Sequence, residues 1–95
     1  MRTYYLSKSS RKDKKYMVKT VGDKTIHFGQ EGMSDYTIHK DDLRKQLYIL
    51  RHKKNENFND LTTAGAWSRY VLWNKPTLKA SIKDLEKKFG VRVIY

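Results

Sequence analysis

The stretch HFGQEGMSDYTIHKD, residues 27–41, decides the fold because it leads out of a predicted strand and into a predicted helix. Its two glycines, Gly29 and Gly32, suit a loop whose backbone takes a positive φ twice. Residues 34–37 (SDYT) offer side-chain oxygens that can accept hydrogen bonds from the first free amides of a helix. We therefore interpret the stretch mainly as a rigid joint between sheet and helices.

The pattern on either side of this joint predicts four strands and three helices. Upstream, alternating side chains separated by turn-forming residues predict an antiparallel meander. Downstream, apolar residues recur at helical spacing, and Pro76, Thr77 and Gly90 mark helix boundaries. The predicted strands are residues 3–8, 15–21, 25–29 and 91–95, with a turn at 22–24, and the predicted helices are residues 38–54, 62–74 and 78–89.

Each predicted helix carries large apolar side chains at positions that fall on one face. These are Leu43, Leu47 and Leu50 in the first helix, Trp67, Tyr70, Val71 and Trp73 in the second, and Leu78, Ile82, Leu85 and Phe89 in the third. The order of elements implies one small basic α+β domain over residues 1–95. We expect a small antiparallel sheet, formed by the N-terminal three-stranded meander plus the C-terminal strand, with about three helices on one face.

The composition restricts the function classes. Cysteine is absent, which excludes disulfides and thiolate metal sites and fits a reducing compartment. Because no apolar run approaches about 18 residues and the N-terminus has no apolar signal core, we expect a soluble protein that is not secreted.

The net charge of +11 is unevenly distributed along the 95 residues. Residues 1–30 carry +6, residues 31–62 carry zero and residues 63–95 carry +5. Such a chain attracts nucleic acid, anionic membranes or acidic protein surfaces. If the last strand joins the meander, the two basic blocks come together in space. The predicted polyanion contacts are Lys8, Arg11, Lys12, Lys14, Lys15, Arg51, Lys53, Lys54, Lys79, Lys83 and Lys87.

Catalytic and metal chemistry have weak support. His27, Asp35 and His39 offer metal ligands, but the two histidines are twelve positions apart across a loop. No nucleophile motif holds Ser34 beside His39, and the acidic residues at 41 and 42 already suit a helix start. GQEG has the spacing of a KH-domain loop but lacks bases between its glycines. We expect no catalytic residue, no metal, no cofactor and no small-molecule substrate.

The segment AGAWSRYVLWNKP, residues 64–76, combines small and aromatic residues. Core packing explains the aromatic side chains simply. A protein–protein contact is the alternative, because tryptophan, tyrosine and arginine dominate the energetics of interfaces. The candidate contact residues are Trp67, Arg69, Tyr70 and Trp73.

The segments HFG, SDYTIHKD, RH, AG-W-SR, LWNKPTL and SIKDLEKKF, in that order, resemble a small protein family encoded by large DNA viruses of eukaryotes, the mimivirus, phycodnavirus and marseillevirus groups. The likeness covers roughly residues 15–90. Phe58 stands where that family commonly has a tryptophan, and Ala66 where a second aromatic residue is usual. The resemblance implies a viral origin and an abundant capsid-lattice or genome-associated protein, and it carries over no catalytic residue.

These observations favour a non-enzymatic virion structural protein, a small basic minor capsid or internal component that contacts other virion proteins. It would reside in the virion, and in the host cytoplasm or viral factory during assembly. The alternative is a sequence-nonspecific nucleic-acid-binding domain that contacts phosphates of viral DNA or RNA.

Overall fold

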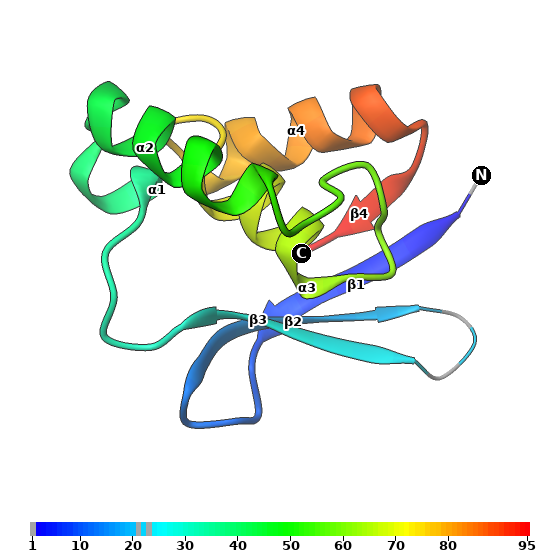
Figure 1. The fold of residues 1–95 in the computed structure, drawn as a ribbon. Coiled ribbons are helices and arrows are strands. Elements are labelled where there is room, and N and C mark those ends of the chain that lie inside the picture. Colours follow the sequence, from blue (N-terminus) through cyan, green and yellow to red (C-terminus); the bar gives the residue numbers. More distant parts are fainter. Residues whose placement is uncertain (1, 21, 23) are drawn as a thin grey trace.

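A computed structural model describes residues 2–20, 22 and 24–95, and it shows a four-stranded sheet covered on one face by helices (Figure 1). The strands are β1 (Thr3–Lys8), β2 (Lys14–Thr20), β3 (Thr25–Gln30) and β4 (Arg92–Ile94), in the spatial order β3-β2-β1-β4. The predicted α+β class is therefore confirmed. Val21 and Asp23, which the predicted second strand and the following turn included, lie outside the described residues.

The direction of the last strand makes the sheet mixed. β1, β2 and β3 form the expected antiparallel meander, in which Leu6 faces Val18 and Val18 faces Ile26. β4 joins the meander, as expected, and pairs with β1, but these two strands run parallel, with Tyr4 opposite Val93. The sheet is therefore antiparallel only over its first three strands.

The helical layer contains α1 (Tyr36–His39), α2 (Asp42–Lys53), α3 (Ala64–Trp67), the π-helix η1 (Ser68–Leu72) and α4 (Leu78–Phe89). The boundaries of α4 match the prediction, because the side chain of Thr77 accepts a hydrogen bond from the Ala80 amide and Gly90 ends the helix in a left-handed conformation. The predicted second helix is present as α3, which continues into η1.

The core lies between the helices and the inner face of the sheet. Trp67 is completely buried, and its ring lies 5.0 Å from that of Tyr4 and 6.2 Å from that of Phe28, measured between centroids. Its indole nitrogen donates a hydrogen bond to the Leu61 carbonyl oxygen at 2.9 Å. The core also contains Leu6, Val18, Ile26, Tyr70, Val71, Leu72, Ile82, Leu85, Val91 and Val93.

The joint between sheet and helices has the two positive φ angles that its glycines suggest. Gly29 has φ +77° and Gly32 has φ +86°. A Cβ atom on Gly29 would lie 2.7 Å from Leu72 Cδ1, so close packing as well as backbone conformation requires glycine there.

The prediction of one continuous helix over residues 38–54 is wrong. The chain forms α1, turns at Lys40 with φ +54°, and begins α2 after Asp41. The Asp41 side chain favours this division, because it accepts from the amides at the start of α2, and Asp35 caps the earlier start of α1 by accepting from the amide of Thr37. His39 is therefore the last residue of α1.

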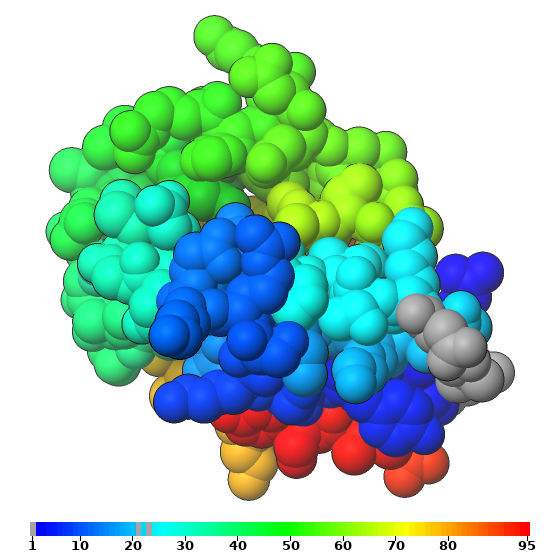
Figure 2. All heavy atoms as spheres, turned by 90° about the horizontal axis from the view of Figure 1, so that it is seen from below, coloured from blue at the N-terminus to red at the C-terminus, as the bar shows by residue number. Residues whose placement is uncertain are grey.

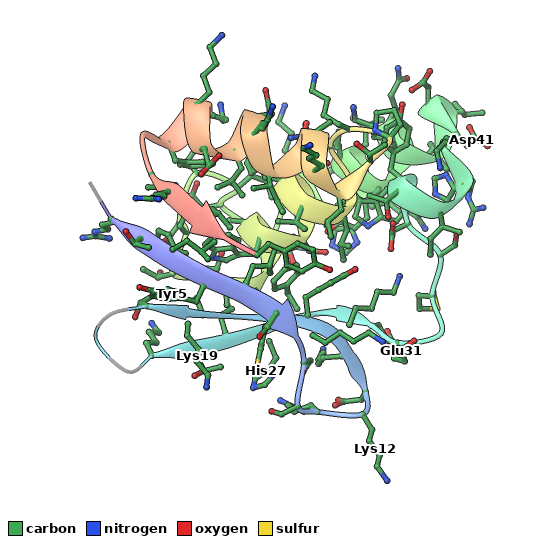
Figure 3. The ribbon with its side chains drawn as sticks, turned by 180° about the vertical axis from the view of Figure 1, so that it is seen from behind. Tyr5, Lys12, Lys19, His27, Glu31 and Asp41 are labelled. Atoms are coloured by element: carbon green, nitrogen blue, oxygen red, sulfur yellow. The ribbon has the colours of Figure 1, made fainter. Side chains whose placement is uncertain are left out.

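The basic regions converge only in part. Arg92 on β4 lies opposite Thr3 on β1, so the C-terminal strand does meet the N-terminal one. The hairpin between β1 and β2 nevertheless projects Lys12 away from the sheet, on the opposite side of the molecule from α4 (Figure 3). The lysines of α4 therefore do not extend the basic surface of the hairpin.

Candidate functional site

The helix α2 exposes its leucines. Leu43 is 64% exposed, Leu47 45% and Leu50 61%, and we call these three residues the leucine face. All twelve residues of α2 are described, and none of them is buried. A surface helix normally turns its apolar stripe toward the core, so α2 has the reverse orientation.

The opposite side of α2 attaches the helix to the protein through aromatic stacking. The Tyr48 ring lies parallel to the Trp73 ring, with centroids 4.3 Å apart, and the His52 ring stacks on Tyr48 at 4.2 Å. The His39 ring packs against the Trp73 ring, with centroids 5.3 Å apart. Burial raises the pKa of the Tyr48 phenol. At 100° per residue, Tyr48 and His52 lie across the helix from the leucine face.

Polar contacts complete this attachment. Lys45 Nζ donates to the Asn74 carbonyl oxygen at 2.6 Å and lies 4.8 Å from the centroid of the Tyr36 ring. Burial lowers the pKa of Lys45, and the nearby Arg69 and Lys75 lower it further. The Tyr36 hydroxyl donates to Asp42 at 2.5 Å, and this hydrogen bond raises the pKa of Tyr36.

A cleft of about 540 Å³ separates α2 from α3 and from the sheet end of the joint. Its buried lining includes the apolar side chains of Phe28 and Leu72 as well as the carboxylate of Asp35. Leu47 lines the cleft from α2, between the exposed Arg44 and Arg51. Figure 2 shows the hollow where the green of α2, the blue of the β1–β2 hairpin and the yellow-green of α3 meet.

A buried ion pair connects β2 to α1 beside this cleft. Lys15 Nζ lies 2.6 Å from Asp35 Oδ2, and the two side chains are 12% and 3% exposed. Lys15 also donates to the Met33 carbonyl oxygen, and Asp35 accepts from the Thr37 amide at 2.9 Å. The structure therefore gives Lys15 a role in the joint, where its charge is already neutralised.

The predicted polyanion contacts fall in three separate regions. The β1–β2 hairpin exposes Lys8, Arg11 and Lys12 and leaves Lys14 half-buried, and Arg11 pairs with Asp13 at 3.1 Å. The end of α2 and the following turn expose Arg51, Lys53 and Lys54, and the outer face of α4 exposes Lys79, Lys83 and Lys87.

The aromatic residues predicted as protein contacts are mostly internal. Trp67 and Tyr70 are buried in the core, so their side chains do not reach a partner on this surface. Arg69 is half-buried, donates to the Trp73 carbonyl oxygen at 2.7 Å and has a pKa lowered by burial. Trp73 is also half-buried and holds α2 in place. Core packing, the simpler interpretation, thus accounts for most of this segment.

The face of the sheet away from the helices carries a second candidate surface. Tyr5 is 49% exposed and lies between Lys19 on β2 and Ile94 on β4. Lys19 and His27 point away from the helical layer (Figure 3). Sequence reasoning missed Tyr5, although the alternation in TYYLSK places it opposite the buried Tyr4 and Leu6.

The residues weighed as metal ligands have other partners. His27 shares a hydrogen bond with Ser9 at 2.7 Å, Asp35 binds Lys15, and His39 Nδ1 accepts from the Asp41 amide at 2.9 Å. Within residues 2–20, 22 and 24–95, no three histidine or acidic side chains gather in a way that would hold a metal ion. Among the helices of this described part, none is long and apolar enough to cross a membrane.

Comparison with known proteins places residues 4–52, just over half of the chain, within a family model described as "Family of unknown function (DUF5754)". This region extends from β1 through α2, so it includes the joint and the leucine face. The comparisons with curated proteins and with solved structures gave no match.

Proposed function

We propose that this chain, which belongs to the family of unknown function DUF5754, is a non-enzymatic protein that acts by stoichiometric contact with other macromolecules. The reversed orientation of α2 carries the proposal. Its leucine face stays in water while Tyr48, Lys45 and His52 turn inward, and exposed apolar faces of this kind are typical of interaction surfaces.

The contact that we propose is assembly into the virion of a large DNA virus, as a small basic minor capsid or internal component. The viral resemblance of the sequence supports this setting, and the net charge of +11 suits contact with acidic virion proteins. The protein would then be located in the virion, and in the host cytoplasm or viral factory during assembly.

Fractionation of purified particles tests this role. Particles of the virus that encodes the chain are separated into shell and genome core, and the protein is quantified in each by mass spectrometry. We expect near-stoichiometric amounts with the shell, and loss of incorporation for Leu47→Asp but not for Lys83→Asp, a control variant on the exposed face of α4. Absence of the protein from purified particles would overturn the proposal.

Nucleic-acid binding without sequence preference is the second candidate, and the uncovered sheet face favours it. Tyr5 offers an exposed ring for base stacking, Lys19 and Arg92 add positive charge to the same face, and Lys12 extends it at the hairpin tip. This arrangement suits a flexible single strand, whose bases can leave their stack and pack on an aromatic side chain.

Fluorescence anisotropy across a salt series tests the second candidate. We expect Lys12→Ala and Lys19→Ala to weaken binding equally for all sequences. Each lost phosphate contact should reduce the slope of log K against log salt concentration by roughly 0.7 on single strands. Tyr5→Ala should weaken single-strand binding by about 1–3 kcal/mol. Lys83→Ala on the far layer is the control. Undetectable binding at low salt excludes this function.

A further inference from the structure

We infer that the cleft beside α2 receives an acidic amphipathic helix of a partner protein. This inference rests on the proposed function and names the class of partner that the leucine face contacts. The cleft suits this one occupant, because its buried apolar side chains, its basic edge and its helical wall each restrict what can bind there.

The apolar part of the site continues from the cleft to the helix surface. Leu47 lines the cleft together with the buried Phe28 and Leu72, and Leu43 and Leu50 lie one turn before and after Leu47 on α2. A partner helix with apolar residues at i, i+3, i+4 and i+7 would place them between these leucines and into the cleft, as helix-in-groove complexes do.

The start of α3 forms the opposite wall of the cleft. Ala64 and Gly65 begin α3 on the far side of the cleft from α2, and neither carries a side chain longer than a methyl group. The Glu56 carboxylate lies over Gly65, because a Cβ atom on Gly65 would be 2.8 Å from Glu56 Cδ, so a partner helix reaches this part of the wall only when the Glu56 side chain turns away. A cleft of about 540 Å³ also lies within the range of roughly 300–1,000 Å³ that is usual for binding pockets.

The charges around the cleft select an acidic partner. Lys14, Arg44 and Arg51 line it, and Lys53 and Lys54 follow at the end of α2. Of the two acidic residues that line it, Asp35 pairs with Lys15, whereas Glu56 lies 3.5 Å from His52, which carries a charge only when protonated. Basic side chains are therefore available to a partner's carboxylates at the edge of an apolar groove.

The same charges disfavour a second copy of this chain as the occupant. Two copies would bring together chains of net charge +11, and the surface of α2 would meet basic residues of the other copy. An acidic helix removes this repulsion and gains charge pairs at the rim, where they set specificity and the association rate.

A designed peptide provides a direct probe. It is a helical peptide of about 20 residues with leucines on one stripe and glutamates elsewhere, and it is titrated into the full chain at low ionic strength. We expect saturable binding with NMR shift changes in α2 and at Gly65, but not in α4. A scrambled peptide of the same composition and a version with lysine in place of glutamate should each bind at least tenfold more weakly.

Two matched variants locate the contact. Arg51→Glu and Lys83→Glu change the net charge equally, but only Arg51 lines the cleft. We expect Arg51→Glu to weaken peptide binding severalfold and Lys83→Glu to leave it within about twofold, because rim charges away from the contact act only through the long-range field. Leu47→Asp should abolish binding while the amide spectrum of the rest of the protein is retained, since Leu47 is exposed.

Three results would overturn the inference: no binding of the acidic peptide at low ionic strength, equal binding of the scrambled peptide, or equal weakening by Arg51→Glu and Lys83→Glu. These results are separable from failure of the proposed function. If Leu47→Asp prevents incorporation into particles although the acidic peptide does not bind, the function stands and the inference fails. If the peptide binds at α2 but the protein is absent from particles, the inference stands and the virion role fails.

Discussion

The helices α2 and α4 are similar in sequence terms and opposite in their packing. Both have twelve residues, a side-chain cap at the N-terminus, basic residues in the last turn and an apolar stripe. α4 buries Leu85 completely and Ile82 almost completely, whereas the leucine face of α2 remains exposed. Helical spacing of apolar residues therefore predicts a helix, but it does not predict what covers the stripe.

The two helices are held by different interactions. α4 contributes apolar side chains to the core, while α2 is attached by the Tyr48–Trp73 stack and by hydrogen bonds from Lys45 and Tyr36. Truncation of apolar side chains should consequently have very different effects in the two helices.

The largest effect is expected for the matched substitutions Leu85→Ala and Leu47→Ala. Leu85 is fully buried, so its truncation should lower the free energy of unfolding by about 2–5 kcal/mol. Leu47→Ala should change it by no more than about 0.5 kcal/mol. Chemical denaturation measures both. A loss above about 2 kcal/mol for Leu47→Ala would show that the leucine face is covered in solution.

The next effect concerns the two aspartate caps, Asp35 and Asp41. Asp35→Ala should lower the free energy of unfolding by about 3 kcal/mol, because it leaves the charge of Lys15 largely buried without its partner. Asp41→Ala removes only an exposed cap of α2 and should cost about 1 kcal/mol. Denaturation of the two variants, and of Asp35→Ala combined with Lys15→Met, checks this. Lys15→Met should recover part of the unfolding free energy that Asp35→Ala removes. If it does not, the loss comes mainly from the Asp35 cap of α1 and not from the ion pair.

A smaller and local effect is expected from Trp73→Ala, which removes the surface on which Tyr48 stacks. Aromatic pairs contribute about 0.5–1.5 kcal/mol beyond their buried area, so the opening free energy of α2 should fall by about 1 kcal/mol. Amide hydrogen exchange should show faster exchange throughout α2 and little change in α4. Tyr5→Ala, an aromatic truncation on the other face of the sheet, is the control. Uniform acceleration in both helices would contradict separate attachment of α2.

The parts of the fold that the sequence predicts correctly are those fixed by local chemistry. Thr77 and Gly90 determine the ends of α4, and Gly29 and Gly32 determine the backbone of the joint, because their conformations depend on few neighbours. The division at Lys40 was missed since Ile38 and His39 suit a longer helix as well as a short one.

The candidate site was less predictable because it depends on distant residues. Which side of α2 faces inward is decided by Trp73 and Asn74, which lie far along the chain from Tyr48 and Lys45. The parallel pairing of β4 likewise depends on where α4 returns the chain. Helical periodicity is the same whichever face is buried, so the leucine face was visible in the sequence but its exposure was not.

The smallest effect is a pH dependence of the α2 attachment. Burial raises the pKa of Tyr48, so the folded state favours the protonated phenol, and this contribution to stability is lost as pH rises through the folded-state pKa. In a spectrophotometric titration, Tyr48 should ionise later than free tyrosine, and Tyr48→Phe should remove one late-titrating group. The hydrogen bond to Asp42 also raises the pKa of Tyr36, so Tyr36→Phe should remove another. Tyr48→Phe could instead remove only a phenol that titrates like free tyrosine, which would show that the inner side of α2 is open to water. α2 would then be attached less tightly than its stacking on Trp73 implies, and its contrast with the buried α4 would be larger.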